Sequence, residues 1–256
     1  MDQGFSGLKD NPTNALNDTL TNIENVDFSD VTSFDLVLNG DAKANILKGG
    51  SGNDIIDGGS GDDKIYAGAG NDKVYASLGS DYEDGGDGID TFIIDEVLDY
   101  IPAIDLQKKA AYLYGTEPTE ENVVNFENIQ ILSSSNFVLI GDDNANILKG
   151  GSGNDIINGG LGSDKISTGN GSDTVVIRQG DGGNIIAEAD IISDFSNGSD
   201  LIGLHNLNYS DLTVEQGSGD YVNDALISSG SEYLVVIEDI NIADLTEADF
   251  VAFEIV

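Results

Sequence analysis

The segment Lys48–Tyr66, KGGSGNDIIDGGSGDDKIY, places glycines and acidic residues side by side and repeats the arrangement nine residues later. Glycine weakens helices and strands because it loses more conformational freedom on folding than any other residue. Neighbouring carboxylates, in addition, repel each other. A chain that repeats both features therefore requires a partner that makes the arrangement favourable.

Net charge narrows the choice of partner. The 256 residues include 47 acidic and 10 basic side chains, a formal net charge of −37 at pH 7. This charge argues against nucleic acid and anionic membranes as electrostatic partners, so a cationic partner is expected. No run approaches 18 apolar residues, so insertion into a membrane is not expected either. Hydrophobic residues make up 39% of the chain, enough to bury a core. The absence of cysteine excludes disulfides and thiolate metal sites.

Nine-residue repeats organise two blocks of the sequence. Residues 40–93 divide into six units of nine, and residues 141–176 divide into four. The segments GDAKANILKGGSGNDIIDGG and GDDNANILKGGSGNDIINGG lie 101 residues apart, and similar lead-ins precede them from Asn22 and Asn125. The chain therefore carries an internal duplication.

Each unit consists of six turn-forming residues and a three-residue strand whose middle residue is usually apolar. Glycines at positions one, two and four permit positive φ and close backbone approach. One apolar residue per short strand cannot fill a hairpin core, whereas stacked strands pool these residues into one interior. The middle residues are Leu47, Ile56, Ile65, Val74, Phe92, Leu148, Ile157, Ile166 and Val175, with Glu83 as the exception. The pattern predicts an all-β solenoid.

Position six of each unit carries aspartate or asparagine. If two units make one coil, residues 18 apart, such as Asp54 and Asp72, lie above one another. Stacked carboxylates repel unless a cation lies between them, and carbonyl oxygens of the turns can complete about six oxygen ligands. Calcium fits best, because magnesium requires a stricter octahedron and zinc prefers His and Cys. The candidate ligands are Asn45, Asp54, Asp63, Asp72, Asp81 and Asp90, followed by Asn146, Asp155, Asp164 and Asp173.

These units resemble the nonapeptide GGxGxDxUx of the RTX (repeats-in-toxin) family of calcium-binding repeats. The resemblance implies a right-handed parallel β-roll, with two nonapeptides per coil and several calcium ions between loops one coil apart. It implies that the units of Asn45 and Asn146 are weaker rungs, and it leaves the sites that involve Asp81 in doubt, because unit 76–84 lacks two of the glycines. The turn glycines taken as further candidate ligands are Gly49, Gly52, Gly58, Gly61, Gly70, Gly150 and Gly153.

The C-terminal third also resembles this family. The segment IRQGDGGNII after Val176 resembles the closing turn of such rolls, with Asp181 as a candidate last ligand. ADIISDFSNGSDLIGL resembles the segment that caps RTX rolls, in which Asp194 and Asp200 would bind or orient a terminal ion. The alternating segments DALISSG and EYLVVIED predict an antiparallel β cap. Glu254–Val256 resembles the terminus of type I secretion substrates.

Five parts are predicted along the chain. They are an N-terminal β lead-in (1–39), a first β-roll block (40–94), an intervening segment and second lead-in (95–140), a second block (141–188), and a capping and secretion-signal region (189–256). Local propensity favours a helix over Leu106–Tyr114, while the lead-ins of the family favour β structure, which we adopt. The N-terminus lacks the basic start and apolar core of a secretory signal peptide, so export would use another signal.

No catalytic residue is predicted. GxSxG, HExxH and Cys/His pairs are absent, and the single histidine, His205, is expected to be a surface or packing residue. The sequence predicts a calcium-binding module of a bacterial protein, secreted or on the cell surface, that folds on calcium outside the cell and uses type I secretion machinery. The alternatives are a polysaccharide-binding or adhesin-like module, with Tyr66 and Tyr75 as sugar contacts, and a less favoured glycan-active enzyme built on two carboxylates.

Overall fold

The computed structural model describes residues 18–32, 34–76, 78–95, 102–113, 115–116 and 122–254. These residues form β-strands and four single-turn 3-10 helices, without an α-helix. Among them, no helix is long and apolar enough to cross a membrane. The chain divides into two compact units, one made of Met1–Ile94 and Glu120–Phe126 and the other of Asp95–Thr119 and Glu127–Val256.

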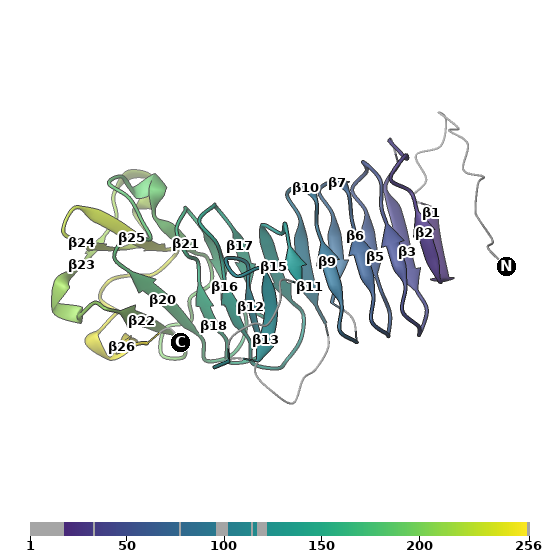
Figure 1. Ribbon diagram of the computed structural model, residues 1–256. Helices are drawn as coiled ribbons and strands as arrows, with labels where there is room; N and C mark the ends of the chain where they lie inside the picture. Colours follow the sequence, from purple (N-terminus) through teal and green to yellow (C-terminus); the bar gives the residue numbers. More distant parts are fainter. Residues whose placement is uncertain are drawn as a thin grey trace. The chain divides into compact units, whose positions relative to one another are not determined.

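The first unit is a parallel β-roll in which the chain alternates between two sheets (Figure 1). One sheet contains, in order, β1 (Asp18–Ile23), β3 (Leu36–Gly40), β5 (Ile55–Asp57), β8 (Lys73–Tyr75) and β11 (Thr91–Ile94). The other contains β14 (Val123–Val124), β9 (Tyr82–Asp84), β6 (Lys64–Tyr66), β4 (Ile46–Lys48) and β2 (Asn25–Asp27). A short parallel pair, β7 (Ala69–Gly70) and β10 (Asp87–Gly88), joins two of the turns.

The strands of the repeat units pair in parallel at a spacing of 18 residues. Ile55 lies beside Lys73 in one sheet, and Ile46 lies beside Lys64 in the other. Two nonapeptide units therefore make one coil, as the sequence predicts. The middle residues of the strands face the interior, where Leu47, Ile56, Ile65 and Val74 are fully buried. The predicted β-roll is confirmed.

Glu83 interrupts this apolar interior. Strand β9 places it in the same row as Ile65 and Val123, and its side chain is only 3% exposed. Burial raises the pKa of Glu83 well above its usual range, and the charges of Asp81 and Asp63 raise it further. A carboxyl group in an apolar interior lowers the stability of the coil unless it is neutral or partnered.

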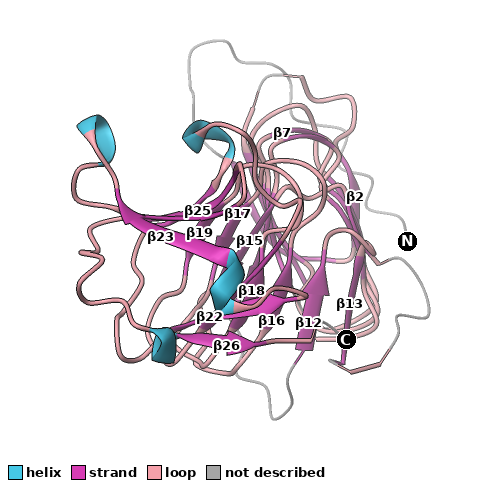
Figure 2. Ribbon diagram, turned by 90° about the vertical axis from the view of Figure 1, so that its left-hand side faces the viewer, coloured by secondary structure: helices cyan, strands magenta, loops and turns pink. Residues whose placement is uncertain are grey.

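The second unit repeats this architecture, and Figure 2 shows its two sheets facing each other. One sheet contains β15 (Asn128–Ile131), β17 (Ile147–Lys149), β19 (Lys165–Ser167), β21 (Asp190–Ile192), β25 (Glu232–Ile237), β24 (Ala225–Ser229) and β23 (Leu212–Gln216). The other contains β13 (Ala110–Leu113), β12 (Pro102–Asp105), β16 (Val138–Ile140), β18 (Ile156–Asn158), β20 (Thr174–Arg178), β22 (Leu201–His205) and β26 (Phe250–Ala252).

An antiparallel extension closes the second unit. β23 pairs with β24 and β24 with β25, as the two alternating segments predict, and β25 continues the parallel sheet beside β21. Ala189, Leu226 and Val236 form a small additional core here. The 3-10 turns are η1 (Ile186–Glu188), η2 (Tyr209–Asp211), η3 (Gly219–Tyr221) and η4 (Glu247–Asp249). The predicted antiparallel cap is confirmed.

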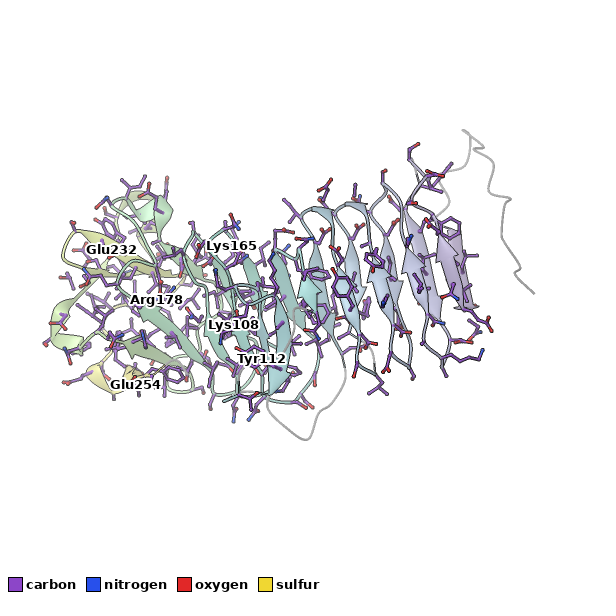
Figure 3. All side chains as sticks on the ribbon, in the orientation of Figure 1. Lys108, Tyr112, Lys165, Arg178, Glu232 and Glu254 are labelled. Carbon is purple, nitrogen blue, oxygen red and sulfur yellow. The ribbon has the colours of Figure 1, made fainter. Side chains whose placement is uncertain are left out.

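The segment between the repeat blocks contains a hairpin. β12 and β13 pair in antiparallel fashion, with Asp105 opposite Ala110, so the chain reverses where local propensity favours a helix. The Tyr112 hydroxyl donates to Asp105 Oδ2 at 2.9 Å, and Lys108 Nζ lies 5.2 Å from the centre of the Tyr112 ring (Figure 3). The β alternative is confirmed and the helix alternative is wrong. Tyr114 lies outside the described residues.

Candidate metal centre

The side chains at position six bind the backbone of the preceding coil. The Asp54 N–H donates to Asp72 Oδ1 at 2.6 Å, and the Asp72 N–H donates to Asp90 Oδ1 at 2.7 Å. In the second unit the Asp155 N–H donates to Asp173 Oδ1 at 2.7 Å. Position-six residues 18 apart therefore lie above one another as predicted. One oxygen of each such carboxylate accepts a backbone hydrogen bond that joins two successive coils. The same bond joins Asn45 to Asp63, Asp63 to Asp81, and Asn146 to Asp164.

These side chains are buried. Nine of the ten position-six side chains are at most 1% exposed, and Asp81 is half-buried. A buried carboxylate lowers stability by several kcal/mol, in order of magnitude, unless protein donors or a cation satisfy both oxygens. We call one position-six side chain and its turn a rung. A rung is closed when protein donors satisfy the second oxygen of that side chain, and it is open when they do not, so that it requires a cation.

Asn45 and Asn146 are satisfied by their own units. Asn45 Oδ1 accepts the Asp41 N–H at 3.0 Å, and Asn45 Nδ2 donates to Asp41 Oδ1 at 3.2 Å. Asn146 and Asp142 repeat these two bonds at 2.8 and 3.2 Å. The amide group supplies a proton donor to the nearby carboxylate, so these rungs are closed without a cation.

Asp54 and Asp155 also have both oxygens occupied. Asp54 Oδ1 accepts the Leu36 N–H at 2.8 Å, and its Oδ2 accepts the Gly50 N–H at 2.8 Å. The equivalent bonds reach Asp155 from Phe137 at 2.8 Å and Gly151 at 3.0 Å. In both units the donor to Oδ2 is therefore the residue at position two of the same nonapeptide.

Other position-six aspartates have one oxygen without a donor. Oδ2 is buried and accepts no hydrogen bond from the described residues in Asp63, Asp72, Asp164 and Asp173. In their units the glycine at position two has positive φ, for example +114° at Gly68 and +89° at Gly169. An unsatisfied buried acceptor costs about 1–3 kcal/mol, and more when it is charged. Because the two units repeat this pattern, the open oxygens are a property of the repeat.

The pKa values of the open aspartates reflect this environment. Burial raises the pKa of Asp63 to about 6 and the pKa values of Asp72, Asp164 and Asp173 to about 7. The charges of position-six carboxylates in neighbouring coils raise these pKa values further, as those of Asp90 and Asp54 do for Asp72. A cation beside the open oxygens would favour the ionised form.

The glycines let the turn backbones approach one another and these carboxylates closely. A Cβ added to Gly68 would overlap the carbonyl oxygen of Gly50, so turns on the same side stack backbone on backbone. A Cβ added to Gly159 would overlap the carboxylate of Asp164. Among the described residues, no three Asp, Glu, His or Cys side chains gather around a common point. A cation here would therefore need turn carbonyls as well as carboxylates, the mixture of oxygen ligands that calcium prefers.

Asp181 has a protein partner for each oxygen. Arg178 Nε donates to Asp181 Oδ1 at 2.6 Å, and the Arg178 N–H donates to Oδ2 at 3.0 Å. Burial raises the pKa of Asp181 to about 6 although Arg178 lowers it. The side chain therefore lies at the end of the second block, as predicted, in an ion pair that competes with a metal. Its role as a ligand stays a prediction.

Asp194 and Asp200 also bind the last turn of the second block. Asp194 Oδ1 accepts the Thr168 N–H at 2.7 Å. Asp200 Oδ1 accepts the Asp173 N–H at 3.1 Å, and its Oδ2 accepts the Ser196 N–H at 2.8 Å. Asp200 thus occupies position six one coil after Asp173. Metal binding by either residue remains a prediction, while their orientation of this turn is observed.

Asp190 is the residue that sequence reasoning missed. It is 2% exposed, and its Oδ1 accepts the Asp164 N–H at 2.9 Å, the bond made at position six throughout the blocks. The spacing from Asp164 is 26 residues instead of 18, so a fixed period does not find it. The available signal is ADII at 189–192, which repeats NDII at 53–56 and 154–157.

The sugar surface suggested for Tyr66 and Tyr75 is not formed by those two residues. Tyr66 lies on β6 and Tyr75 on β8, strands of different sheets. Tyr66 instead packs against Tyr82, with ring centres 5.6 Å apart. Tyr66 and Tyr75 therefore do not share one sheet face, because successive strands alternate between the sheets, and sugar binding stays a prediction.

The match to a family model agrees with this geometry. The family model described as RTX calcium-binding nonapeptide repeat (4 copies) matches residues 37–65, 58–92 and 140–175. The search of curated proteins found no match. Among solved structures, the crystal structure of extracellular lipase LipA from Serratia marcescens is similar at 16% identity and a TM-score of 0.33, over 87% of this chain and 40% of that chain. The two blocks of this chain are RTX calcium-binding nonapeptide repeats.

Proposed function

We propose that this chain is a calcium-dependent folding module of a secreted or cell-surface bacterial protein. The observation that carries the proposal is the buried Oδ2 of Asp63, Asp72, Asp164 and Asp173, which accepts no hydrogen bond from the part of the chain that the structure describes. Calcium ions bound beside these oxygens would complete the rungs, with carbonyl oxygens of the glycine turns as further ligands. The residues that hold the ions would be the position-six aspartates, with the turn glycines of neighbouring coils.

Calcium concentration would act as the switch between two states of the chain. In a cytosol with submicromolar calcium, 47 acidic side chains repel one another and the open carboxylates disfavour the coil. Outside the cell, at roughly millimolar calcium, weak extracellular-type sites fill. Each site then adds about 2.7 kcal/mol at a hundredfold excess over its Kd. Several sites together can offset the entropy lost when a glycine-rich chain is ordered.

Export by type I secretion is the second part of the proposal. The extended, calcium-free chain suits a narrow channel, and folding outside would prevent its return. The support is the repeat family and the resemblance of Glu254–Val256 to such secretion signals, although the last two residues lie outside the described part of the chain. The division of the chain into five parts is also a proposal, and in it the type I secretion machinery recognises the last part, residues 189–256.

A calcium titration of the full chain followed by far-ultraviolet circular dichroism tests the proposal. We expect little β structure in excess chelator and a cooperative gain of β structure as calcium rises, with magnesium much less effective at equal concentration. Isothermal titration would show several bound ions. The same spectrum in chelator and in calcium would refute the proposal.

Polysaccharide binding is a second candidate function, favoured by one observation. Tyr66 and Tyr82 form a tilted aromatic pair on the outward positions of β6 and β9, both half-buried. Aromatic rings are common in sugar-binding surfaces, yet outward aromatic residues also pack for stability alone. Retention on acidic and neutral glycan columns in calcium tests this function, with Tyr66→Ala as the variant. No retention of the wild-type chain would rule it out.

A further inference from the structure

Asparagine followed directly by glycine occurs at four places in the chain, at Asn39, Asn158, Asn170 and Asn197. In such a pair the backbone nitrogen of the glycine can attack the side-chain amide of the asparagine, because glycine has no Cβ to shield the nitrogen and restricts the backbone least. The reaction needs only water and replaces an amide with a carboxylate. Its rate depends on how firmly the fold holds the asparagine side chain and the following backbone.

Three of the four pairs are held in place. Asn39 lies within β3, where this strand pairs with β5. Asn158 is only 5% exposed, and its Oδ1 accepts the Gly160 N–H at 3.2 Å. Asn197 is exposed, but its Nδ2 donates to the carbonyl oxygen of Asp244 at 2.7 Å. Each of these side chains must give up strand pairing, burial or a hydrogen bond before it can meet the next backbone nitrogen.

Asn170 lacks these restraints. It lies at position three of the last nonapeptide, in a turn between β19 and β20, and it is exposed. Within the described part of the chain, neither the Asn170 side-chain amide nor the Gly171 N–H forms a hydrogen bond. The nitrogen that attacks and the amide that it attacks are therefore both accessible in the folded chain.

We propose that Asn170 is a site of spontaneous covalent modification, at which water converts the side-chain amide to a carboxylate. The Gly171 nitrogen loses its proton to hydroxide and forms a bond to Asn170 Cγ. The bond between Cγ and Nδ2 breaks, and the nitrogen takes up a proton from water and leaves as ammonia. Water then opens the resulting five-membered ring at either carbonyl carbon, which gives aspartate or isoaspartate. No atom is oxidised or reduced.

The two products differ in their effect on the turn. Aspartate leaves the backbone unchanged, and Asp87 occupies position three of another unit, so the roll accepts it there. Isoaspartate routes the backbone through the side chain and lengthens it by a carbon atom. The Asn170 N–H donates to the Gly151 carbonyl oxygen at 3.0 Å, and the Ser172 N–H donates to Asn154 Oδ1 at 2.9 Å. A longer backbone between these two donors moves them out of register with the neighbouring coil, so isoaspartate loosens the turn.

Peptide mapping by mass spectrometry tests the site in the full chain, kept folded in calcium at pH 8. Trypsin cleaves after Lys and Arg, so the four pairs fall in four different peptides, and cleavage at Lys165 and Arg178 (Figure 3) releases the one with Asn170. We expect conversion at Asn170 to be about tenfold faster than at the other three, because those must first lose favourable contacts. Conversion at Asn170 no faster than at Asn197 would overturn the site.

The same measurement in urea separates the effect of the fold from that of the flanking sequence. Once the chain is unfolded, the four pairs share the same chemistry and should convert at similar rates. A rate at Asn170 that exceeds the others by the same factor in urea as in the folded chain would show that the turn has no part in its reactivity, and would overturn the structural basis of the site.

Asn170→Ser is the matched variant for the effect on the turn, because Ser51, Ser60 and Ser152 occupy position three in other units. After the same incubation, the wild-type chain should unfold at a lower urea concentration as isoaspartate accumulates, whereas Asn170→Ser should keep its midpoint. An equal loss in both chains would overturn the loosening of the turn. Neither measurement depends on how many calcium ions bind, so the inference stands or falls separately from the proposed function.

Discussion

Asn146 and Asp164 occupy the same position in successive coils of one column, yet the two rungs differ in what they need. Asn146 is closed by Asp142, with an N–H donor for each oxygen acceptor. Asp164 has a buried oxygen with no donor among the described residues. Asn45 and Asp63 repeat the contrast in the other unit. An amide at position six therefore closes its rung without a cation, whereas a carboxylate whose second oxygen lacks a backbone donor requires one.

Removing an open aspartate should have the largest effect. Asp72→Ala deletes the acceptor of the Asp54 N–H and the open oxygen together. We expect a loss of about 3–5 kcal/mol of stability in calcium, because one partner of a buried charged contact is removed. The calcium midpoint followed by circular dichroism should rise several-fold. Asp87→Ala removes an exposed carboxylate of the turn stacked one coil further along, where Asp87 lies beside Ala69, and serves as the control. Equal midpoints for both variants would contradict the account.

Glu83 offers a change in the opposite direction. Glu83→Leu restores an apolar residue to the row of Ile65 and should stabilise the first unit by about 1–4 kcal/mol. Urea denaturation in saturating calcium measures the gain. Ile65→Glu is the reverse variant and should destabilise the same row. A loss of stability in Glu83→Leu would mean that the carboxyl group has a partner essential to the coil.

Converting a closed rung to an open one sharpens the comparison. Asn146→Asp removes the donor to Asp142 and adds a carboxylate beside it. At calcium concentrations near the midpoint we expect a loss of about 1–2 kcal/mol, the order of one unsatisfied buried group. A hundredfold excess of calcium should recover part of the loss. Urea denaturation at the two concentrations gives the difference, and an equal loss at both would show that the rung does not respond to calcium.

Low pH should stabilise the folded chain in the absence of calcium, with a smaller effect than those of the substitutions above. The pKa values of Asp72 and Asp173 are raised by burial to about 7 in the folded chain, against about 3.9 when unfolded. Their contribution to stability is therefore complete below about pH 4 and is lost as pH rises through about 7. We expect circular dichroism in chelator to show more β structure at pH 5 than at pH 8.

The double variant Asp72→Asn/Asp173→Asn separates this effect from the fall in net charge. Its calcium-free spectrum should depend less on pH than that of the wild-type chain, because the two groups no longer titrate. Protons should also compete with calcium, so the wild-type calcium midpoint should rise as pH falls below about 7. A midpoint that falls with acidity would contradict the assignment of these carboxylates as ligands.

The coil itself was predictable from sequence because its period is regular. Nine-residue units with one apolar residue, such as Ile56, fix which residues share the interior, and pairing at 18 residues follows from two units per coil. The conformations of individual turns were not predictable. Gly50 and Gly59 occupy the same place in GGSG, yet only Gly59 has positive φ. Gly50 stacks on the lead-in at Val31, and Gly59 stacks on Asp41 of a repeat unit.

Those turn conformations decide which carboxylates are open. The Gly50 N–H satisfies Asp54, whereas the Gly59 N–H donates to Asp57 at 2.9 Å and leaves Asp63 open. Sequence alone treats both aspartates as equal ligands. Asp190 was not predictable for another reason. The inserted loop lengthens the spacing from Asp164 to 26 residues, whereas the pairing of β19 with β21 still places Asp190 above Asp164.

Diffraction from crystals grown in calcium tests the central claim most directly. Anomalous difference maps locate calcium independently of how the side chains are built. We predict peaks beside Oδ2 of Asp72 in the first unit and Asp173 in the second, and no peak enclosed by Asn146 and Asp142. Well-ordered turns with only water beside Asp72 and Asp173, in ample calcium, would contradict the account.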